Sequence, residues 1–68
     1  MILEQLGERV RELRKAQGLS QEKFAFKAEI DRTYLAGIEQ GKRNPSIKSL
    51  EKIIQALDVS FHTFFEGM

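Results

Sequence analysis

Residues 21–39, QEKFAFKAEIDRTYLAGIE, decide the fold of this chain. Two short runs with helical character, about 21–28 and 32–39, are joined by only three residues, 29–31. Three residues are too few for an antiparallel hairpin of long helices, but they suit two short helices that cross at a steep angle. That crossing needs a small residue where the helices touch, here Ala25, and apolar residues on the inner face of the second helix, here Leu35 and Ile38. The stretch therefore predicts a helix-turn-helix unit over about 21–39.

Helix signals continue on both sides of this unit. Apolar residues recur along one face of a first helix over about 2–17, and Gly18 follows where a left-handed C-terminal cap belongs. Two further helices are predicted over about 47–57 and 61–65. Side chains that cap helix starts precede the last four helices: Ser20, Asp31, Ser46 and Ser60. Hydrophobic pairs bracket three of these starts: Leu19 with Phe24, Ile30 with Leu35, and Val59 with Phe64.

No alternating strand pattern occurs, so the predicted fold class is all-α, a compact five-helix bundle with a helix-turn-helix. The chain of 68 residues is expected to form one domain over 1–68. A chain this short buries roughly 60% of its unfolded surface, which leaves a thin core. Cysteine is absent, so neither a disulfide nor a thiolate metal site can reinforce that core. A homodimer is therefore expected, because association adds buried surface.

No apolar run reaches the roughly 18 residues of a membrane span, and no signal-peptide pattern opens the chain. A cytoplasmic protein of a bacterium or phage is expected, with no membrane partner. Its net charge of +1 conceals an uneven distribution. Residues 32–52 carry a local charge of +3. Two acidic residues, Glu39 and Glu51, are outnumbered there by five basic ones: Arg32, Lys42, Arg43, Lys48 and Lys52. Such a basic surface suits selective binding to a polyanion, although a solvated mixture of charges would also produce it.

The outward face of the helix over 32–39 is nearly flush. At about 100° per residue, Leu35, Ile38 and Tyr34 point inward. The opposite face carries small or polar side chains: Thr33, Ala36, Gly37, Gln40 and, at its edge, Arg32. Glycine inside a helix costs about 1 kcal/mol relative to alanine, so Gly37 needs an explanation. Either another helix packs closely there, or the glycine is simply tolerated, or the face enters a DNA major groove, which is roughly 12 Å wide.

Cations beside this face favour the groove. A basic turn, GKRNP (41–45), follows the helix, and from it Lys42, Arg43 and Asn44 can reach the flanking phosphates. Backbone N–H groups at the start of the helix over 47–57 add an anion site, and the start of the helix over 21–28 offers another. The expected phosphate-binding residues are Gln21, Tyr34, Gln40, Lys42, Asn44, Ser46 and Lys48.

The segment LSQEKFAFKAEIDRTYLAGIEQGKRNPSIKSLEKIIQALDVS (19–60) resembles the Cro/C1-type (XRE) helix-turn-helix family of lambda-repressor-like DNA-binding domains. The pattern Q…A…L..IE.G carries this resemblance. Within the family, RTYLAGIEQGKRNPSIKSLE (32–51) is most similar to the controller proteins of restriction–modification systems. The resemblance implies a transcriptional regulator, a repressor or an activator, that binds a palindromic double-stranded DNA operator as a homodimer.

Carried over residue by residue, the resemblance implies that Arg32 and Thr33 reach base edges in the major groove. It implies that Ala36 and Gly37 lie close to the bases, and it adds Arg43 to this base-reading set. An arginine can donate a bidentate pair to guanine O6 and N7, and a threonine can contact a thymine methyl group.

The resemblance also implies two bracing interactions. Gln21 would contact a phosphate and support the recognition helix. Arg14 and Glu39 match a family pair that forms a salt bridge between the first and third helices. A semi-buried carboxylate needs such a partner, so Glu39 is expected to be structural rather than catalytic.

Two positions depart from the family pattern. Glu29 replaces a glycine whose backbone is left-handed, and a non-glycine residue there costs on the order of 1–2 kcal/mol, so strain or a different turn shape is expected. The helix over 21–28 is one that some members use to touch RNA polymerase, which makes the polymerase a candidate partner. On this helix Glu22 matches an acidic position that contacts the polymerase in those members, whereas Phe26 replaces a residue that is often polar in phage repressors.

The C-terminal segment over about 58–68 is the predicted dimerisation segment. Phe61, Phe64 and Phe65 share one helical face, and a bundle this small cannot readily bury three rings. Phe64 is assigned to the core through its pairing with Val59, and the interface is assigned to Phe61, His62 and Phe65. The alternative is that all three rings complete the core of the monomer.

An enzyme is not expected. His62 is the one histidine, it stands beside no evident nucleophile, and no metal-ligand or phosphate-loop spacing occurs. No cofactor and no metal site are predicted. The rival interpretation is an antitoxin-like module of the same fold, whose main partner is a protein that binds the aromatic surface of Phe26, Phe61 and Phe65.

Overall fold

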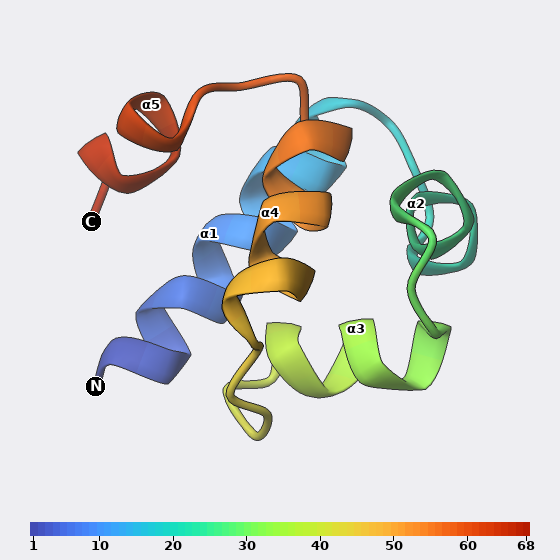
Figure 1. Ribbon diagram of the computed structural model, residues 1–68, viewed down its shortest axis with the longest axis horizontal. Helices are drawn as coiled ribbons and strands as arrows, with labels where there is room; N and C mark the ends of the chain where they lie inside the picture. Colours follow the sequence, from blue (N-terminus) through green and yellow to red (C-terminus); the bar gives the residue numbers. More distant parts are fainter.

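Five α-helices make up residues 1–68 of the computed structural model, and the chain contains no strand. They are α1 (Ile2–Ala16), α2 (Gln21–Ala28), α3 (Arg32–Glu39), α4 (Ile47–Ala56) and α5 (Phe61–Glu66). The α4 helix crosses in front of α1, with α2 at the right, α3 along the bottom and α5 at the upper left, and both chain termini lie on the left (Figure 1). The all-α class and the five predicted helices are confirmed. None of these helices has both the length and the apolar composition needed to cross a membrane.

Local capping explains where the helices begin and end. Each predicted cap side chain accepts a hydrogen bond from the backbone N–H of the third residue after it, over 3.0–3.1 Å: Ser20, Asp31, Ser46 and Ser60. After α1, Gly18 adopts the predicted left-handed conformation, with φ of +73°. The boundaries of α2 and α3 are therefore set by residues next to them in the sequence, which is why the sequence predicts them.

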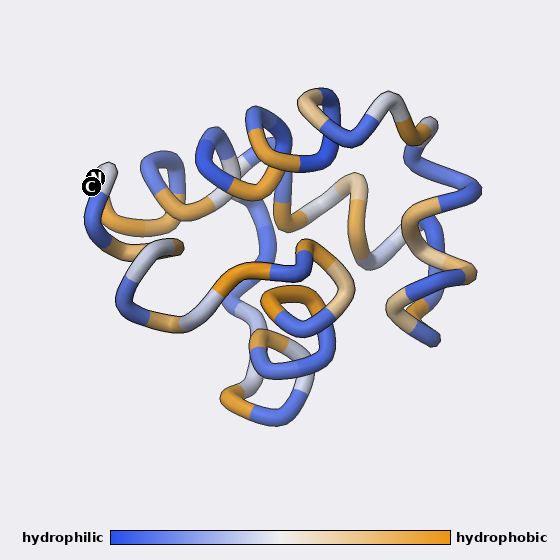
Figure 2. The backbone as a smooth tube through the Cα atoms, turned by 90° about the horizontal axis from the view of Figure 1, so that it is seen from above, coloured by the Kyte–Doolittle hydropathy of each residue, from blue (hydrophilic) through white to orange (hydrophobic).

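The core lies between the helices, and hydrophobic and hydrophilic stretches alternate along each of them (Figure 2). The second members of the three predicted hydrophobic pairs, Phe24, Leu35 and Phe64, are fully buried. Their partners are partly buried and pack against the same core: Leu19, Ile30 and Val59. Ala25, the small residue predicted at the crossing of α2 and α3, is buried as well.

A close approach of α1 to α3, which the sequence analysis did not anticipate, occurs at Gly7. A methyl group added at Gly7 would overlap the carbonyl oxygen of Ile38 and lie 2.8 Å from that of Glu39. Only a glycine lets the two backbones come so near, because any Cβ would push α1 away from α3. Gly7 thus sets how deeply α3 sits against the bundle.

The turn between α2 and α3 has the left-handed backbone that the resemblance implies for this position. Glu29 takes the left-handed conformation, with φ of 59° and ψ of 42°. The expectation of a differently shaped turn is therefore wrong, and the other expectation, a non-glycine residue in a left-handed backbone, is what the structure shows. Asp58, after α4, has a φ of 60° and is a second such residue that the sequence analysis missed. Each costs about 1–2 kcal/mol relative to glycine, which the surrounding packing must offset.

Candidate nucleic-acid interface

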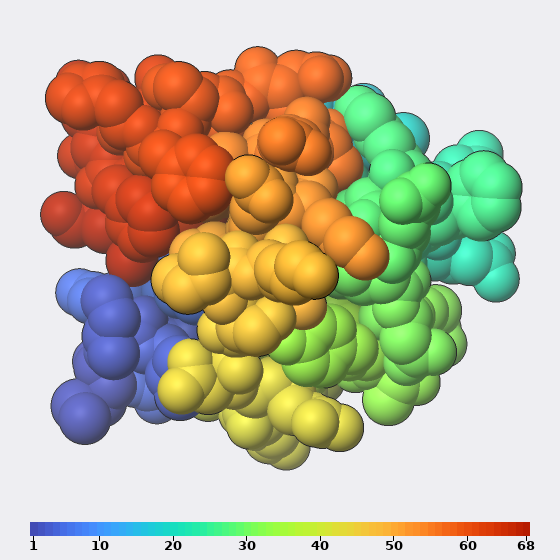
Figure 3. Space-filling view, viewed as in Figure 1, coloured from blue at the N-terminus to red at the C-terminus, as the bar shows by residue number.

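The two sides of α3 differ as the helical wheel predicts. Leu35, Ile38 and Glu39 are buried, whereas Arg32, Thr33 and Gln40 are exposed. Ala36, Gly37 and Tyr34 are half-buried. Together with the loop that follows, α3 forms one continuous edge of the molecular surface (Figure 3). The small residues are therefore accessible at the surface rather than enclosed in the core.

The space beside Gly37 is filled by the side chain of Arg43. A methyl group at Gly37 would lie 2.5 Å from the Cγ atom of Arg43, whose Cζ atom is 5.8 Å from the ring centroid of Tyr34. Another helix does not pack at Gly37, so that interpretation is wrong, and the nearest side chain is that of Arg43. No sequence signal could reveal this contact, because only the path of the loop brings Arg43 back over α3.

The loop after α3 holds three exposed polar residues in a defined conformation. Gly41 has a φ of +75°, as a tight turn after the helix requires. The backbone N–H groups of Lys42 and Arg43 both donate to the carbonyl oxygen of Gly37, over 2.9 and 3.2 Å. Lys42, Arg43 and Asn44 are thereby presented to solvent beside the outer face of α3.

At the start of α4, two predicted phosphate-binding residues contact each other. The backbone N–H of Ser46 donates to the hydroxyl oxygen of Tyr34 over 3.4 Å, a weak bond that links α4 to α3. The Ser46 hydroxyl caps α4 and also donates to the hydroxyl of Ser49 over 3.0 Å. The Tyr34 hydroxyl accepts this bond and keeps its own proton free to donate. Lys48, two positions after Ser46, is exposed.

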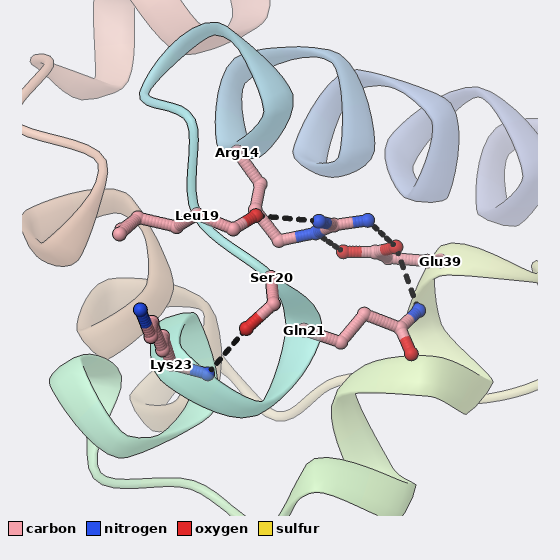
Figure 4. Close-up of polar contacts among 6 residues, drawn as sticks. All are labelled: Arg14, Leu19, Ser20, Gln21, Lys23 and Glu39. Carbon is pink, nitrogen blue, oxygen red and sulfur yellow. Dashed lines mark hydrogen bonds and ion pairs between the residues drawn. The ribbon is translucent and has the colours of Figure 1, made fainter.

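A buried polar network holds α3 against α1 and α2 (Figure 4). The Arg14 guanidinium donates two hydrogen bonds to the Glu39 carboxylate, over 2.7 and 3.0 Å, and both side chains are buried. It donates a third to the carbonyl oxygen of Leu19 over 2.7 Å. Gln21 donates to the same carboxylate over 3.0 Å, which is the brace that the resemblance implies. The salt bridge expected between α1 and α3 is present, and no buried side-chain polar atom lacks a partner.

The three C-terminal phenylalanines separate into core and surface. Phe64 is fully buried, whereas Phe61 and Phe65 are 44% and 40% exposed, so the alternative in which all three complete the core is wrong. The Phe65 ring meets the Phe64 ring edge to face, with centroids 5.0 Å apart. His62 is exposed on the same helix. The α5 helix thus presents aromatic surface at the opposite end of the molecule from α3 (Figure 1).

Comparison with known proteins places these features in a family. Residues 10–64 match the sequence profile of the family described as helix-turn-helix. The control protein C.MunI of a Mycoplasma species is 44% identical over 63 residues, which cover 91% of this chain and 85% of that protein. The HTH-type transcriptional regulator SinR of Bacillus subtilis is 42% identical over 62 residues, covering 90% of this chain and 56% of SinR. A solved tetramer of the restriction–modification controller protein C.Esp1396I with its natural 35 base-pair operator superposes with a TM-score of 0.92, at 42% identity, over 98% of this chain and 88% of that one.

Proposed function

Because this chain belongs to the Cro/C1-type helix-turn-helix family, we propose that it regulates transcription by binding a specific double-stranded DNA operator as a homodimer. The observation that carries the proposal is the outer face of α3, where the small, half-buried residues Ala36 and Gly37 lie between exposed polar residues and a cationic loop. The relative SinR is named as a transcriptional regulator, and the structural neighbour C.Esp1396I is a controller protein solved in complex with its operator. Control of a restriction–modification operon is the specific role that we propose.

In this proposal α3 lies in the major groove. A helix enters that groove only when its outer side chains are short, and Ala36 and Gly37 meet this need. Arg32, at the first turn of α3, donates to guanine O6 and N7, and Thr33 contacts a thymine methyl group. Arg43 reads a further base after leaving its place over Gly37.

Phosphates on either side of the groove are held from four segments of the chain. The loop supplies Lys42 and Asn44, the start of α4 supplies Ser46 and Lys48, and α2 supplies Gln21. Tyr34 and Gln40 complete this set from α3. Contacts to phosphate fix the register of the protein on the duplex but carry no sequence information, so specificity rests on the base-reading residues.

Two copies pair through the exposed aromatic surface of α5. One recognition helix covers too few base pairs to select a site in a genome, and a two-fold dimer on a palindrome doubles the length that is read. The interface comprises Phe61, His62 and Phe65. Burial of two partly exposed rings in each copy contributes apolar surface to this interface.

A protein partner is a second proposal, which rests on α2. Phe26 is 86% exposed, so its ring is available for contact with a partner. RNA polymerase, contacted through Glu22, is the partner that fits an activator, whereas Phe26 departs from the residue that is often polar at its position. A toxin-like protein bound by the aromatic surface is the rival, and in either case the protein acts in the cytoplasm and without catalysis.

Selection of bound sequences from a random pool of duplexes, followed by footprinting, tests the proposal. We expect an inverted repeat whose half-sites are centred about one helical turn, or roughly 10 base pairs, apart. If Lys42, Arg43 and Lys48 each neutralise one phosphate in both copies, the slope of log affinity against log salt should be near −5, at about −0.9 per phosphate. Binding without sequence preference, together with stable capture of one protein partner, would instead support the toxin-like rival.

A further inference from the structure

The α5 helix is attached to the rest of the molecule by an arginine from α1. The Arg9 guanidinium donates from Nε to the carbonyl oxygen of Phe64 over 2.7 Å and from Nη2 to that of Thr63 over 2.8 Å. Its remaining nitrogen, Nη1, donates to the Glu12 carboxylate over 2.9 Å. Phe64 is the one fully buried side chain of this six-residue helix and attaches α5 to the core. The two bonds from Arg9 are the polar attachment of α5 to α1.

This arrangement answers a specific need of the helix end. The last carbonyl groups of a helix have no partner within the helix, and a cation there is also favoured by the helix dipole. The planar fork of an arginine can donate to two such oxygens in a fixed geometry, which a lysine cannot do. The Arg9 side chain is only 17% exposed, so water competes weakly for these bonds.

Gly67 leaves the space that the guanidinium occupies. Its φ of −84° is available to any residue, so backbone freedom does not explain the glycine. A methyl group at Gly67 would lie 2.8 Å from the Cζ atom and 3.0 Å from the Nη1 atom of Arg9. Arg9 and Gly67, near opposite ends of the chain, therefore form one unit, which we term the α5 anchor.

We propose that the α5 anchor positions the dimer surface. Arg9 holds the two carbonyl groups that immediately precede Phe65 in the chain, so it fixes the backbone from which the Phe65 ring projects. The angle of α5 then sets both how tightly two copies associate and how far apart their two α3 helices lie on DNA. This inference rests on the proposed homodimer through Phe61 and Phe65.

Arg9→Met tests the anchor, because methionine keeps the apolar stem and removes every donor. We expect the dissociation constant of the dimer, measured by sedimentation equilibrium, to rise about tenfold or more, a difference of ~1.4 kcal/mol. Arg11→Met is the matched control, since Arg11 is an exposed arginine on the same helix and its loss changes the charge equally. It should leave the dissociation constant within about twofold, a change below ~0.5 kcal/mol.

A duplex that carries a single half-site of the selected operator separates positioning from general stability. Because α5 is far from α3, Arg9→Met should not change binding to this duplex (Figure 1). The Arg9→Met variant should bind the full operator more weakly than the wild type does, and it should discriminate less between operators with different half-site spacings. Equal losses on the half-site and in dimerisation would mean that Arg9 acts on the whole fold, and would overturn the proposal.

Gly67→Ala gives an independent test, because it disturbs the anchor without touching Arg9. Alone, it should weaken dimerisation in the same direction as Arg9→Met. In the double variant it should add little, since the guanidinium that it displaces is already gone and an untethered methionine can move aside. Additive effects of the two changes would show that the residues do not share one anchor.

Phe65→Ala distinguishes failure of the anchor from failure of the dimer surface. If Phe65→Ala leaves the sedimentation behaviour unchanged, the proposed homodimer surface is wrong. If Phe65→Ala weakens the dimer while Arg9→Met does not, the surface stands and only the anchor is wrong.

Discussion

On its inner face α3 packs against α1 through backbone atoms and a buried ion pair. On its outer face it is covered only by the flexible side chain of Arg43. A methyl group at Gly7 of α1 would overlap backbone oxygens of α3, and the Arg14–Glu39 ion pair is buried beside this contact. Across the helix, Gly37 is covered by the exposed side chain of Arg43. The same eight-residue helix therefore has one face that determines folding and one that we propose determines recognition.

The largest effect is expected at the buried carboxylate. Glu39→Ala leaves the Arg14 guanidinium buried without its charge partner, which typically costs about 3–5 kcal/mol. Chemical unfolding should show this loss, and the exposed neighbouring change Gln40→Ala should stay within roughly 0.5 kcal/mol of the wild type. A double change, Arg14→Met with Glu39→Leu, should recover much of the loss, because it removes both charges from the interior. Equal stabilities of Glu39→Ala and Gln40→Ala would erase the distinction between the two faces.

The next effect is expected where α1 and α3 touch. Gly7→Ala should destabilise the protein by about 1–3 kcal/mol, since the added methyl group has no space and the helices must separate. By helix propensity alone the same change would stabilise α1 by about 1 kcal/mol, so the two explanations predict opposite signs. Chemical unfolding measures the sign, with the exposed change Glu8→Ala as a control on the same helix.

On the outer face the effect should appear in DNA binding and not in stability. Arg32→Ala should weaken binding to the selected operator by roughly 1–3 kcal/mol and relax the preference at one base pair. Lys48→Ala is the contrast, because loss of a phosphate contact should weaken binding to all duplexes alike and make the salt slope shallower. An equal loss for Arg32→Ala on operator and random DNA would remove Arg32 from the base-reading set.

The smallest effect, and the most specific, is expected at Gly37. Gly37→Ala gains up to about 1 kcal/mol of helix propensity but displaces Arg43, so its net effect on unfolding should be near zero. In an Arg43→Ala background the same change should be stabilising, because the three nearest atoms to the added methyl group all belong to Arg43. The same stability change in both backgrounds would show that Arg43 does not rest on Gly37 in solution.

Prediction from the sequence succeeded mainly where the deciding residues are neighbours in the chain, although the left-handed backbone of Asp58 was not predicted. Ser20 and Asp31 cap helices within one turn, and the assignment of Phe64 to the core followed from its pairing with Val59 five positions earlier. The Arg14–Glu39 pair was implied only by resemblance to a family, because nothing local to either residue indicates the other. Gly7 was missed for the same reason, since its neighbours in sequence are ordinary residues of an amphipathic helix.

By itself the sequence determined the five helices, their caps and the short turn that makes a helix-turn-helix. These depend on periodicity and on hydrogen bonds within a turn or two, which the chain encodes directly. Tertiary structure alone decided that Arg43 lies over Gly37, that Arg9 reaches the end of α5 and that Gly7 admits the carbonyl group of Ile38. Each of these contacts joins groups that become neighbours only when the helices pack, so their chemistry exists only in the folded molecule.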